Sequence, residues 1–188
     1  MCFNLLFQVP KLLITSPTAQ VVLITPKTVS TKKNFGNLLF ELTAEASLSG
    51  FYYSSVGQIP DKVYGLYLCR GDIGGQGCGQ CVYQAQNSIL KECPTQIWAV
   101  LWYDNCMLHF SNETFYHQMD DYPSNVEWNP ENITSNKTRA FSKVLNNTMM
   151  DLTPEIVNSK VKFGTKMANI TSSKKLYTLG QCTLDLSA

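Results

Sequence analysis

Cysteine is the residue type with the most chemistry to offer in this chain of 188 residues. Five of the seven cysteines lie in one stretch, at Cys69, Cys78, Cys81, Cys93 and Cys106. Cysteines this close together can form disulfides, bind zinc or carry out redox chemistry. A zinc ribbon needs two Cys-x2-Cys pairs, and a thioredoxin-like site needs one pair without other cysteines nearby; neither context is fully present. The spacing therefore favours a disulfide framework.

Asparagine gives a second signal of an oxidising compartment. Acceptor sequences for N-linked glycans, Asn-x-Ser/Thr, occur at Asn112, Asn132, Asn136, Asn146 and Asn169. One such sequence is a weak signal, and close neighbours such as Asn132 and Asn136 can go unused. Several of them in a Cys-rich chain favour secretion. We therefore expect a secreted, disulfide-bonded glycoprotein.

A catalytic site is harder to assemble from these residues. Asp104, His109, Ser111 and His117 are the candidates, because a nucleophile needs a base and the base needs an orienting group. No Gly-x-Ser-x-Gly, His-Glu-x-x-His or protein-kinase motif supports them. Asp104 is explained more simply by a turn before Cys106, and His109 by a structural role in a strand. We expect no enzyme, no metal and no cofactor; a hydrolase is the alternative of another class.

Composition excludes several other classes of function. The chain is 44% hydrophobic and 15% charged, which is typical of a globular protein. Its net charge of +1, without a dense Lys/Arg stripe, gives no case for nucleic-acid binding. No apolar run reaches the roughly eighteen residues of a membrane span.

The elements that hold the cysteines follow from periodicity. Residues 33–47 carry apolar side chains at helical spacing, with Gly50 as a stop, and residues 78–91 form a second helix stopped by Cys93-Pro94. Strands are expected over residues 51–58, 63–69, 97–103 and 107–110. This order predicts an α+β fold, an antiparallel β-sheet with two helices packed on one face and stapled by disulfides.

Several short motifs in this stretch occur in a fixed order. They are Val-Tyr-Gly-Leu before Cys69, Arg-Gly-Asp after it, the spacing Cys69-x8-Cys78-x2-Cys81, Cys93-Pro94, and Trp-Tyr-Asp-Asn before Cys106. Over residues 33–116 they resemble the plant Gnk2-homologous domain, also called DUF26 or the stress-antifungal domain. That domain occurs in cysteine-rich repeat secretory proteins, in ectodomains of cysteine-rich receptor-like kinases and in plasmodesmata-located proteins.

The resemblance implies a disulfide pattern. The pairs are Cys69–Cys78 and Cys81–Cys106, with Cys93 bonded to a cysteine near the start of the unit, for which Cys2 is the upstream candidate. Loop-closure entropy gives roughly 2.7 kcal/mol for the first pair and roughly 3.5 kcal/mol for the second. Their sum is comparable with the whole net stability of a small domain.

The resemblance also implies a function, a secreted recognition module of the plant apoplast without catalysis, active in defence or stress. Some family members bind mannose through an Asn, an Arg and a Glu; the matching positions here hold Phe3, Val100 and Ser111. Valine cannot donate hydrogen bonds to a sugar, and serine cannot replace a carboxylate. Nearby Glu113 is a surface residue of the Asn112 sequon. We expect the mannose site to be lost, and the partner to be another carbohydrate or another Gnk2-homologous domain protein.

A repeat organises the rest of the chain. Residues 175–185 repeat residues 62–72, with a matching helix expected over 138–150 and a strand over 162–170. No second helix or Cys-x2-Cys follows, so we interpret this part as a truncated second copy. Cys182 lacks the partner at the x8 spacing and is predicted to be a free thiol. Such a fragment suggests a second function, pairing with a receptor-like kinase ectodomain or a related repeat protein.

The predicted organisation has four parts. Residues 1–32 are an atypical segment interrupted by prolines, which is a poor signal peptide, an altered gene model or strands at a domain edge. Residues 33–118 form the first Gnk2-homologous domain, residues 119–127 a linker, and residues 128–188 the partial second domain.

Overall fold

The computed structural model describes residues 2–3, 18–21, 28–92, 96–119, 133 and 135–186. Predictions about Cys93 and Asn132, about most of residues 1–32 and about the linker lie outside the described residues, as do the side chains of Cys2, Phe3 and Asn136. The chain divides into two compact units. The larger unit is Thr15–Asn125, and the smaller unit combines Met1–Ile14 with Val126–Ala188.

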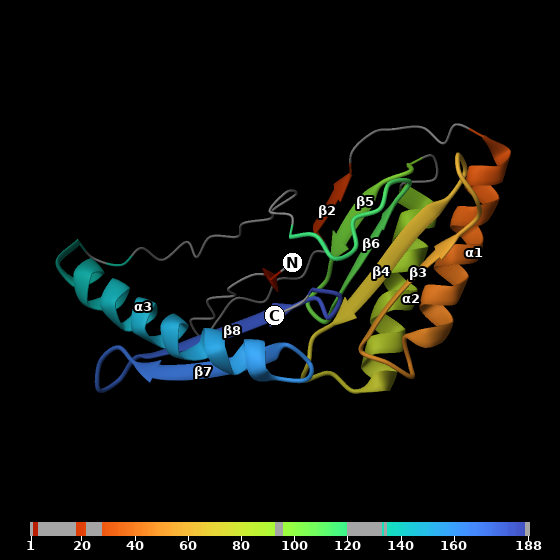
Figure 1. Cartoon of the computed structure of the whole chain (residues 1–188). Coiled ribbons are helices and arrows are strands. Elements are labelled where there is room, and N and C mark those ends of the chain that lie inside the picture. The colour runs from red at the N-terminus through yellow and green to blue at the C-terminus, as the bar shows by residue number, and fades with distance from the viewer. Residues whose placement is uncertain are drawn as a thin grey trace. The chain divides into compact units, whose positions relative to one another are not determined.

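The larger unit is a five-stranded antiparallel sheet with two helices on one face (Figure 1). The strands are β2 (Thr18–Val21), β3 (Phe51–Val56), β4 (Val63–Cys69), β5 (Ala99–Trp102) and β6 (Cys106–Ser111), in the order β2-β5-β6-β4-β3. The helices are α1 (Val29–Glu45) and α2 (Gly75–Glu92). The predicted α+β fold is confirmed for this unit.

Helix α1 begins and ends earlier than the periodicity predicted. Thr28 caps it, because the Thr28 side chain accepts a hydrogen bond from the Thr31 N–H at 3.1 Å. At the other end, the Glu45 carbonyl accepts from Leu48 and Ser49, and the helix is over before Gly50. The cap is a polar contact, which a search for apolar spacing does not detect.

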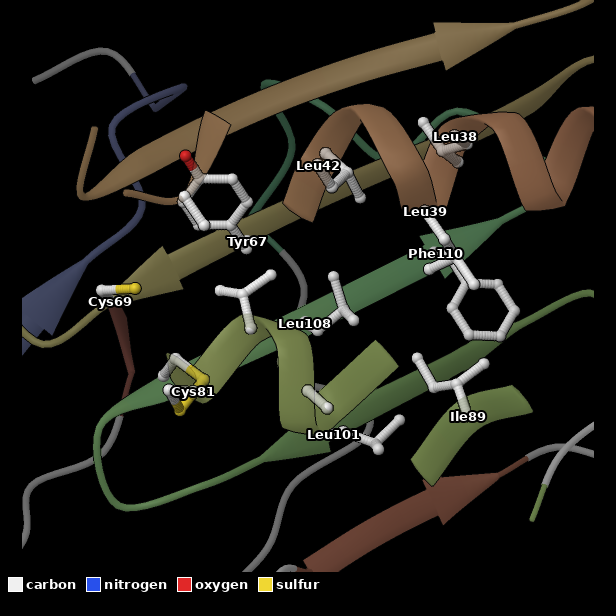
Figure 2. Packing of buried hydrophobic residues seen from close by; sticks show 14 of the residues in the cluster. Leu38, Leu39, Leu42, Tyr67, Cys69, Cys81, Ile89, Leu101, Leu108 and Phe110 are labelled. Carbon is white, nitrogen blue, oxygen red and sulfur yellow. A yellow bond between two sulfur atoms is a disulfide. The ribbon is translucent and has the colours of Figure 1, made fainter. Parts of the chain in front are cut away.

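The core of the larger unit lies between the helices and the sheet (Figure 2). Leu38 and Leu42 of α1 lie directly over Gly65 of β4, where an added Cβ would stand 2.9 Å from a Leu38 methyl group. Glycine at this position therefore allows the helix to approach the sheet closely. Tyr67, fully buried beside them, donates its hydroxyl to the Ser49 carbonyl at 3.1 Å, and burial raises the pKa of Tyr67.

Four cysteines form one cross-linked node at the start of α2. Cys69 of β4 and Cys106 of β6 are register partners on neighbouring strands. Cys69 is bonded to Cys78 and Cys106 to Cys81, with Cα–Cα distances of 5.6 and 6.0 Å. These are the two pairings that the family resemblance implied. Because all four sulfur atoms are in disulfides, they are not available to hold zinc.

The smaller unit is a three-stranded sheet covered by one helix. Its elements are β1 (Cys2–Phe3), α3 (Ser135–Asn158), β7 (Phe163–Asn169) and β8 (Lys175–Cys182), with strand order β1-β8-β7. Leu152 and Ile156 of α3 pack on Gly164 and Gly180, and a Cβ at Gly180 would lie 2.5 Å from an Ile156 methyl group. Helix, strand and strand thus follow one another as α1, β3 and β4 do in the larger unit. The truncated second copy itself remains a prediction.

The N-terminal segment contributes an edge strand to each unit. β2 pairs with β5 in the larger unit, and β1 pairs with β8 in the smaller one. In the second pairing, Cys2 lies in register opposite Cys182. Cys182 is disulfide-bonded, so the predicted free thiol is wrong. The prediction looked for a partner only at the downstream x8 spacing, whereas the cross-strand neighbour of Cys182 comes from the other end of the chain.

Asp61 anchors the N-terminus of α1 to the loop before β4. Its carboxylate accepts hydrogen bonds from the hydroxyls of Thr28 and Thr31, the latter at 2.5 Å. Asn34 donates to the Asp61 carbonyl at 2.8 Å. The Thr28 hydroxyl, and after it the Thr31 hydroxyl, lower the pKa of Asp61 below its ordinary value of 3.8.

We expect Asp61→Asn to destabilise the larger unit at neutral pH and to have little effect in strong acid. A depressed folded-state pKa contributes stability above the unfolded pKa, and that contribution is lost as the pH falls through the folded value. The thermal midpoints of wild type and variant, measured from pH 7 downward, should therefore converge below pH 3.8. Glu113→Gln, at an exposed carboxylate, is the control. A constant gap at all pH values would contradict the assignment.

Candidate recognition surface

The sheet face opposite the helices of the larger unit carries a group of aromatic side chains. Along β4, Gly65 and Tyr67 face the helices, so Tyr64, which directly precedes Gly65, points to the other face of the sheet. Ring contacts join Tyr64 to a set that we call the outer aromatic cluster. Its members are Tyr53, Tyr64, Trp98, His109, Phe115, Tyr116 and His117.

His109 lies in the buried part of this cluster. Its ring stacks on Phe115 with centroids 3.7 Å apart, and Trp98 meets it edge-on at 5.6 Å. His109 is only 5% exposed. A side chain in this environment packs as an aromatic ring, which agrees with the structural role predicted for it.

Tyr116 fixes the segment after β6 onto the sheet. Its hydroxyl accepts a hydrogen bond from the Gly65 N–H at 2.7 Å. The same hydroxyl donates to the Ser54 carbonyl and lies 2.9 Å from the Gly65 carbonyl. Ser54 and Gly65 are register partners on β3 and β4, so one side chain bridges two strands. Nothing in the local sequence predicts this, because the contacts span 51 and 62 residues.

The accessible part of the cluster is a small aromatic surface. Tyr53 is 41% exposed, His117 is exposed, and Tyr64 and Tyr116 are half-buried. The Tyr53 and Tyr116 rings lie 4.8 Å apart at 56°, and the Lys62 ammonium stands 5.1 Å from the centre of Tyr64. Ring faces held in this way can stack on the C–H groups of a ligand or attract a cation.

The proposed acid–base residues are not brought together. Asp104 lies in the turn before β6 and Ser111 ends that strand, and β6 alone, from Cys106 to Ser111, spans about 16 Å at the rise of a β-strand. His109 is buried between them. His117 packs edge-on against Tyr53, with the ring centroids 6.0 Å apart. Within the described ranges, no three His, Cys, Asp or Glu side chains converge to form a metal site.

Comparisons with known proteins agree on the family. The family model described as salt stress response/antifungal matches residues 24–113. The chain is similar to an Arabidopsis thaliana cysteine-rich receptor-like protein kinase 10, at 38% identity over 82% of this chain and 23% of the relative. An antimicrobial ginkbilobin-2-like protein of Castanea crenata is 35% identical over 82% of this chain and 63% of the relative.

The solved structures give the same fold. The tandem DUF26 ectodomain of the Arabidopsis thaliana receptor-like protein PDLP8 superposes with a TM-score of 0.73, covering 90% of this chain and 78% of that chain at 22% identity. This chain carries a Gnk2-homologous (DUF26) domain. It spans less than two thirds of the length of the curated relatives named above. Among the helices that the structure describes, none has the length and apolar character to span a bilayer.

Two of the three positions that the resemblance implied for a mannose site have described side chains, and both are buried. Val100 is 1% exposed and lies opposite His109; Ser111 is 4% exposed and lies opposite Tyr64. The Ser111 hydroxyl accepts from the Glu113 N–H at 2.9 Å, so it caps the turn after β6. Both side chains are therefore covered, and the loss of the mannose site stays a prediction.

The described sequons lie in both units and differ in exposure. Asn146 and Asn169 are exposed and Asn112 is half-buried; glycosylation at each sequon stays a prediction.

Tyr103, the tyrosine of the Trp-Tyr-Asp-Asn motif, packs on the inner core, and its hydroxyl donates a hydrogen bond to the Ser88 hydroxyl at 2.8 Å. Sequence reasoning did not single out Tyr53 or Tyr116, because no residue-type pattern marks either as part of a surface.

We expect Tyr116→Phe to destabilise the larger unit by about 1–3 kcal/mol, since it leaves the buried Gly65 N–H without the hydroxyl. Urea unfolding measures the change. Tyr83→Phe, which removes a hydroxyl from an exposed tyrosine of α2, is the matched control and should have no effect. Equal stability of the two variants would show that the hydroxyl bridge is unimportant.

Proposed function

We propose that this chain is a secreted, non-catalytic recognition module of the plant apoplast that acts in defence or stress. The observation that carries the proposal is the four-cysteine node, because disulfides persist in oxidising compartments. The sequons support the same location. The antimicrobial role in the name of the Castanea crenata relative supports defence. The separation of Asp104 from Ser111 supports a module without catalysis.

The ligand that we propose for the outer aromatic cluster is a carbohydrate other than mannose. Exposed tyrosine rings stack well on pyranose faces whose hydroxyls are all equatorial, because such faces present only C–H groups. The buried Val100 and Ser111 argue against mannose at the family's position. Lys62, beside Tyr64, adds a hydrogen-bond donor at the rim of this surface.

A second candidate is an interaction module that pairs with a receptor-like kinase ectodomain or a related repeat protein. The names of several relatives and the ectodomain structures favour it. Binding of such an ectodomain would use a protein–protein interface and not the outer aromatic cluster. A pull-down with the ectodomain of a receptor-like kinase distinguishes the two.

The compartment is tested by the intact mass of the protein made in plant cells, with and without reductant and glycosidase. We expect an extracellular product that loses mass with glycosidase and gains hydrogen atoms on reduction, because disulfides and glycans are both added in the secretory pathway. The peptides linking Cys69 to Cys78 and Cys81 to Cys106 should be recovered. A reduced, unglycosylated product retained inside the cell would overturn the proposal.

The ligand is tested with cellohexaose and with a mannan polysaccharide, by calorimetry on the secreted protein. We expect binding of cellohexaose, weakened about fivefold by Tyr53→Ala, and no binding of mannan. Phe40→Ala removes an exposed aromatic ring from α1, outside the cluster, and should change nothing. Binding of mannan, or equal loss in both variants, would refute the assignment to this cluster.

A further inference from the structure

Strand β8 of the smaller unit has one edge that is only partly paired. On one side β8 pairs with β7 over seven residues, from Lys175 to Gln181. On the other side, β1 pairs only with Gln181 and Cys182. Among the described residues, no strand pairs with Lys175–Gly180 on that side.

The direction of the backbone groups follows from one hydrogen bond. The Cys182 N–H donates to the Lys162 carbonyl at 2.9 Å and therefore points toward β7. Backbone groups in an antiparallel ladder alternate in direction from residue to residue. The backbone N–H and C=O groups of Leu176, Thr178 and Gly180 thus also point toward β7. Those of Tyr177 and Leu179 point to the opposite edge of β8.

Among the described residues, the part of this edge between Leu176 and Gly180 carries none of the usual protection against pairing. Natural edge strands are blunted by charges, prolines or bulges. Between Leu176 and Gly180, β8 has no charged residue and no proline. Tyr177 is 43% exposed and Leu179 half-buried, on the face away from α3. The outward groups therefore lie beside apolar side chains, as at a site that accepts a strand.

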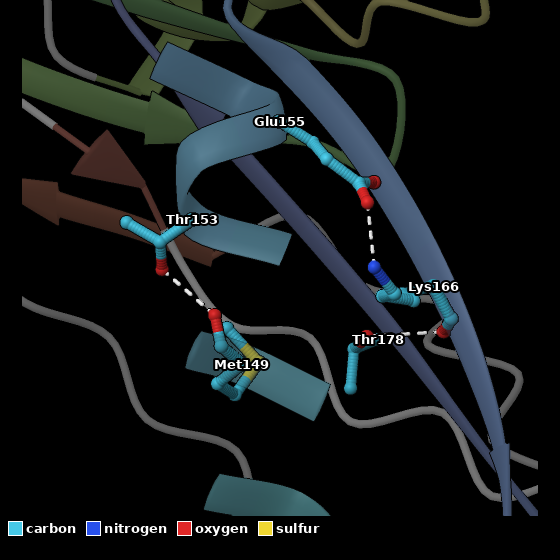
Figure 3. A network of polar contacts seen from close by, with 5 residues as sticks. All are labelled: Met149, Thr153, Glu155, Lys166 and Thr178. Carbon is cyan, nitrogen blue, oxygen red and sulfur yellow. Dashed lines mark hydrogen bonds and ion pairs between the residues drawn. The ribbon is translucent and has the colours of Figure 1, made fainter. Parts of the chain in front are cut away.

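The opposite edge of the same sheet is protected. Lys166 lies in the middle of β7, and its ammonium is 2.5 Å from the Glu155 carboxylate of α3 (Figure 3). A strand docked along β7 would desolvate this ion pair. The Asn169 sequon stands at the end of β7 as well. Pairing is therefore favoured at β8.

We propose that β8 pairs antiparallel with β8 of a second copy of this chain, with Tyr177 opposite Leu179 of that copy. In this register the outward N–H and C=O groups of both residues bond across the two-fold axis. Each tyrosine meets a leucine on the exposed face, which is a favourable cross-strand pair. The two Lys175 side chains fall at opposite ends of the interface, so like charges do not meet. This inference goes beyond the proposed recognition function and does not depend on it.

The test is the mass of the secreted protein in solution as a function of concentration, for wild type and two proline variants. Tyr177→Pro removes an outward N–H of β8 and leaves the β7 ladder intact. Met167→Pro is the matched control, because Met167 is the register partner of Tyr177 and its N–H points to the far edge of β7. We expect a dimer for wild type and for Met167→Pro, and a dimer dissociation constant that is raised more than about tenfold in Tyr177→Pro.

Amide hydrogen exchange on the wild type gives a second readout if a proline variant fails to fold. The Tyr177 and Leu179 amides should exchange more slowly at high protein concentration, and the Thr165 and Met167 amides should not respond. A monomer at every concentration, a dimer that survives Tyr177→Pro, or protection confined to β7 would each overturn the proposal. A monomer that is secreted and binds cellohexaose would do so while leaving the proposed function intact.

Discussion

The attachment of α2 to two neighbouring strands is the constraint on which the larger unit depends. Cys69 and Cys106 lie side by side on β4 and β6, and their partners Cys78 and Cys81 are one helical turn apart on α2. The node therefore sets the position of the helix and its rotation about its own axis. With α2 fixed, α1 closes the same face by packing Leu38 and Leu42 over Gly65. The opposite face is left for the outer aromatic cluster.

Much of this fold could be predicted from the sequence, because its signals are local. The apolar spacing around Leu38 and Leu42 gave α1, and the alternation before Cys69 gave β4. The family motifs implied the two disulfides of the node. Cys182 was different, because its cross-strand neighbour Cys2 is at the other end of the chain and no spacing rule connects them.

The candidate surface could be predicted from the sequence less well than the fold. The sequence predicts a substituted mannose site at Val100 and Ser111, but only the structure shows that these side chains are buried. Tyr116 owes its role to two backbone groups of Gly65 and one of Ser54, and no residue type or motif encodes such contacts. In this domain the disulfide-bonded framework thus supports a surface whose properties depend on long-range packing.

The four-cysteine node also has a consequence for biosynthesis. All of its cysteines lie between Cys69 and Cys106, and the two loops that they close have sequence separations of only 9 and 25 residues. A chain that enters an oxidising lumen N-terminus first can therefore complete both bonds before α3, β7 and β8 have entered that lumen. The larger unit is then covalently locked while the smaller unit is still emerging. Misfolding of the smaller unit would therefore occur after the disulfides of the larger unit have already formed.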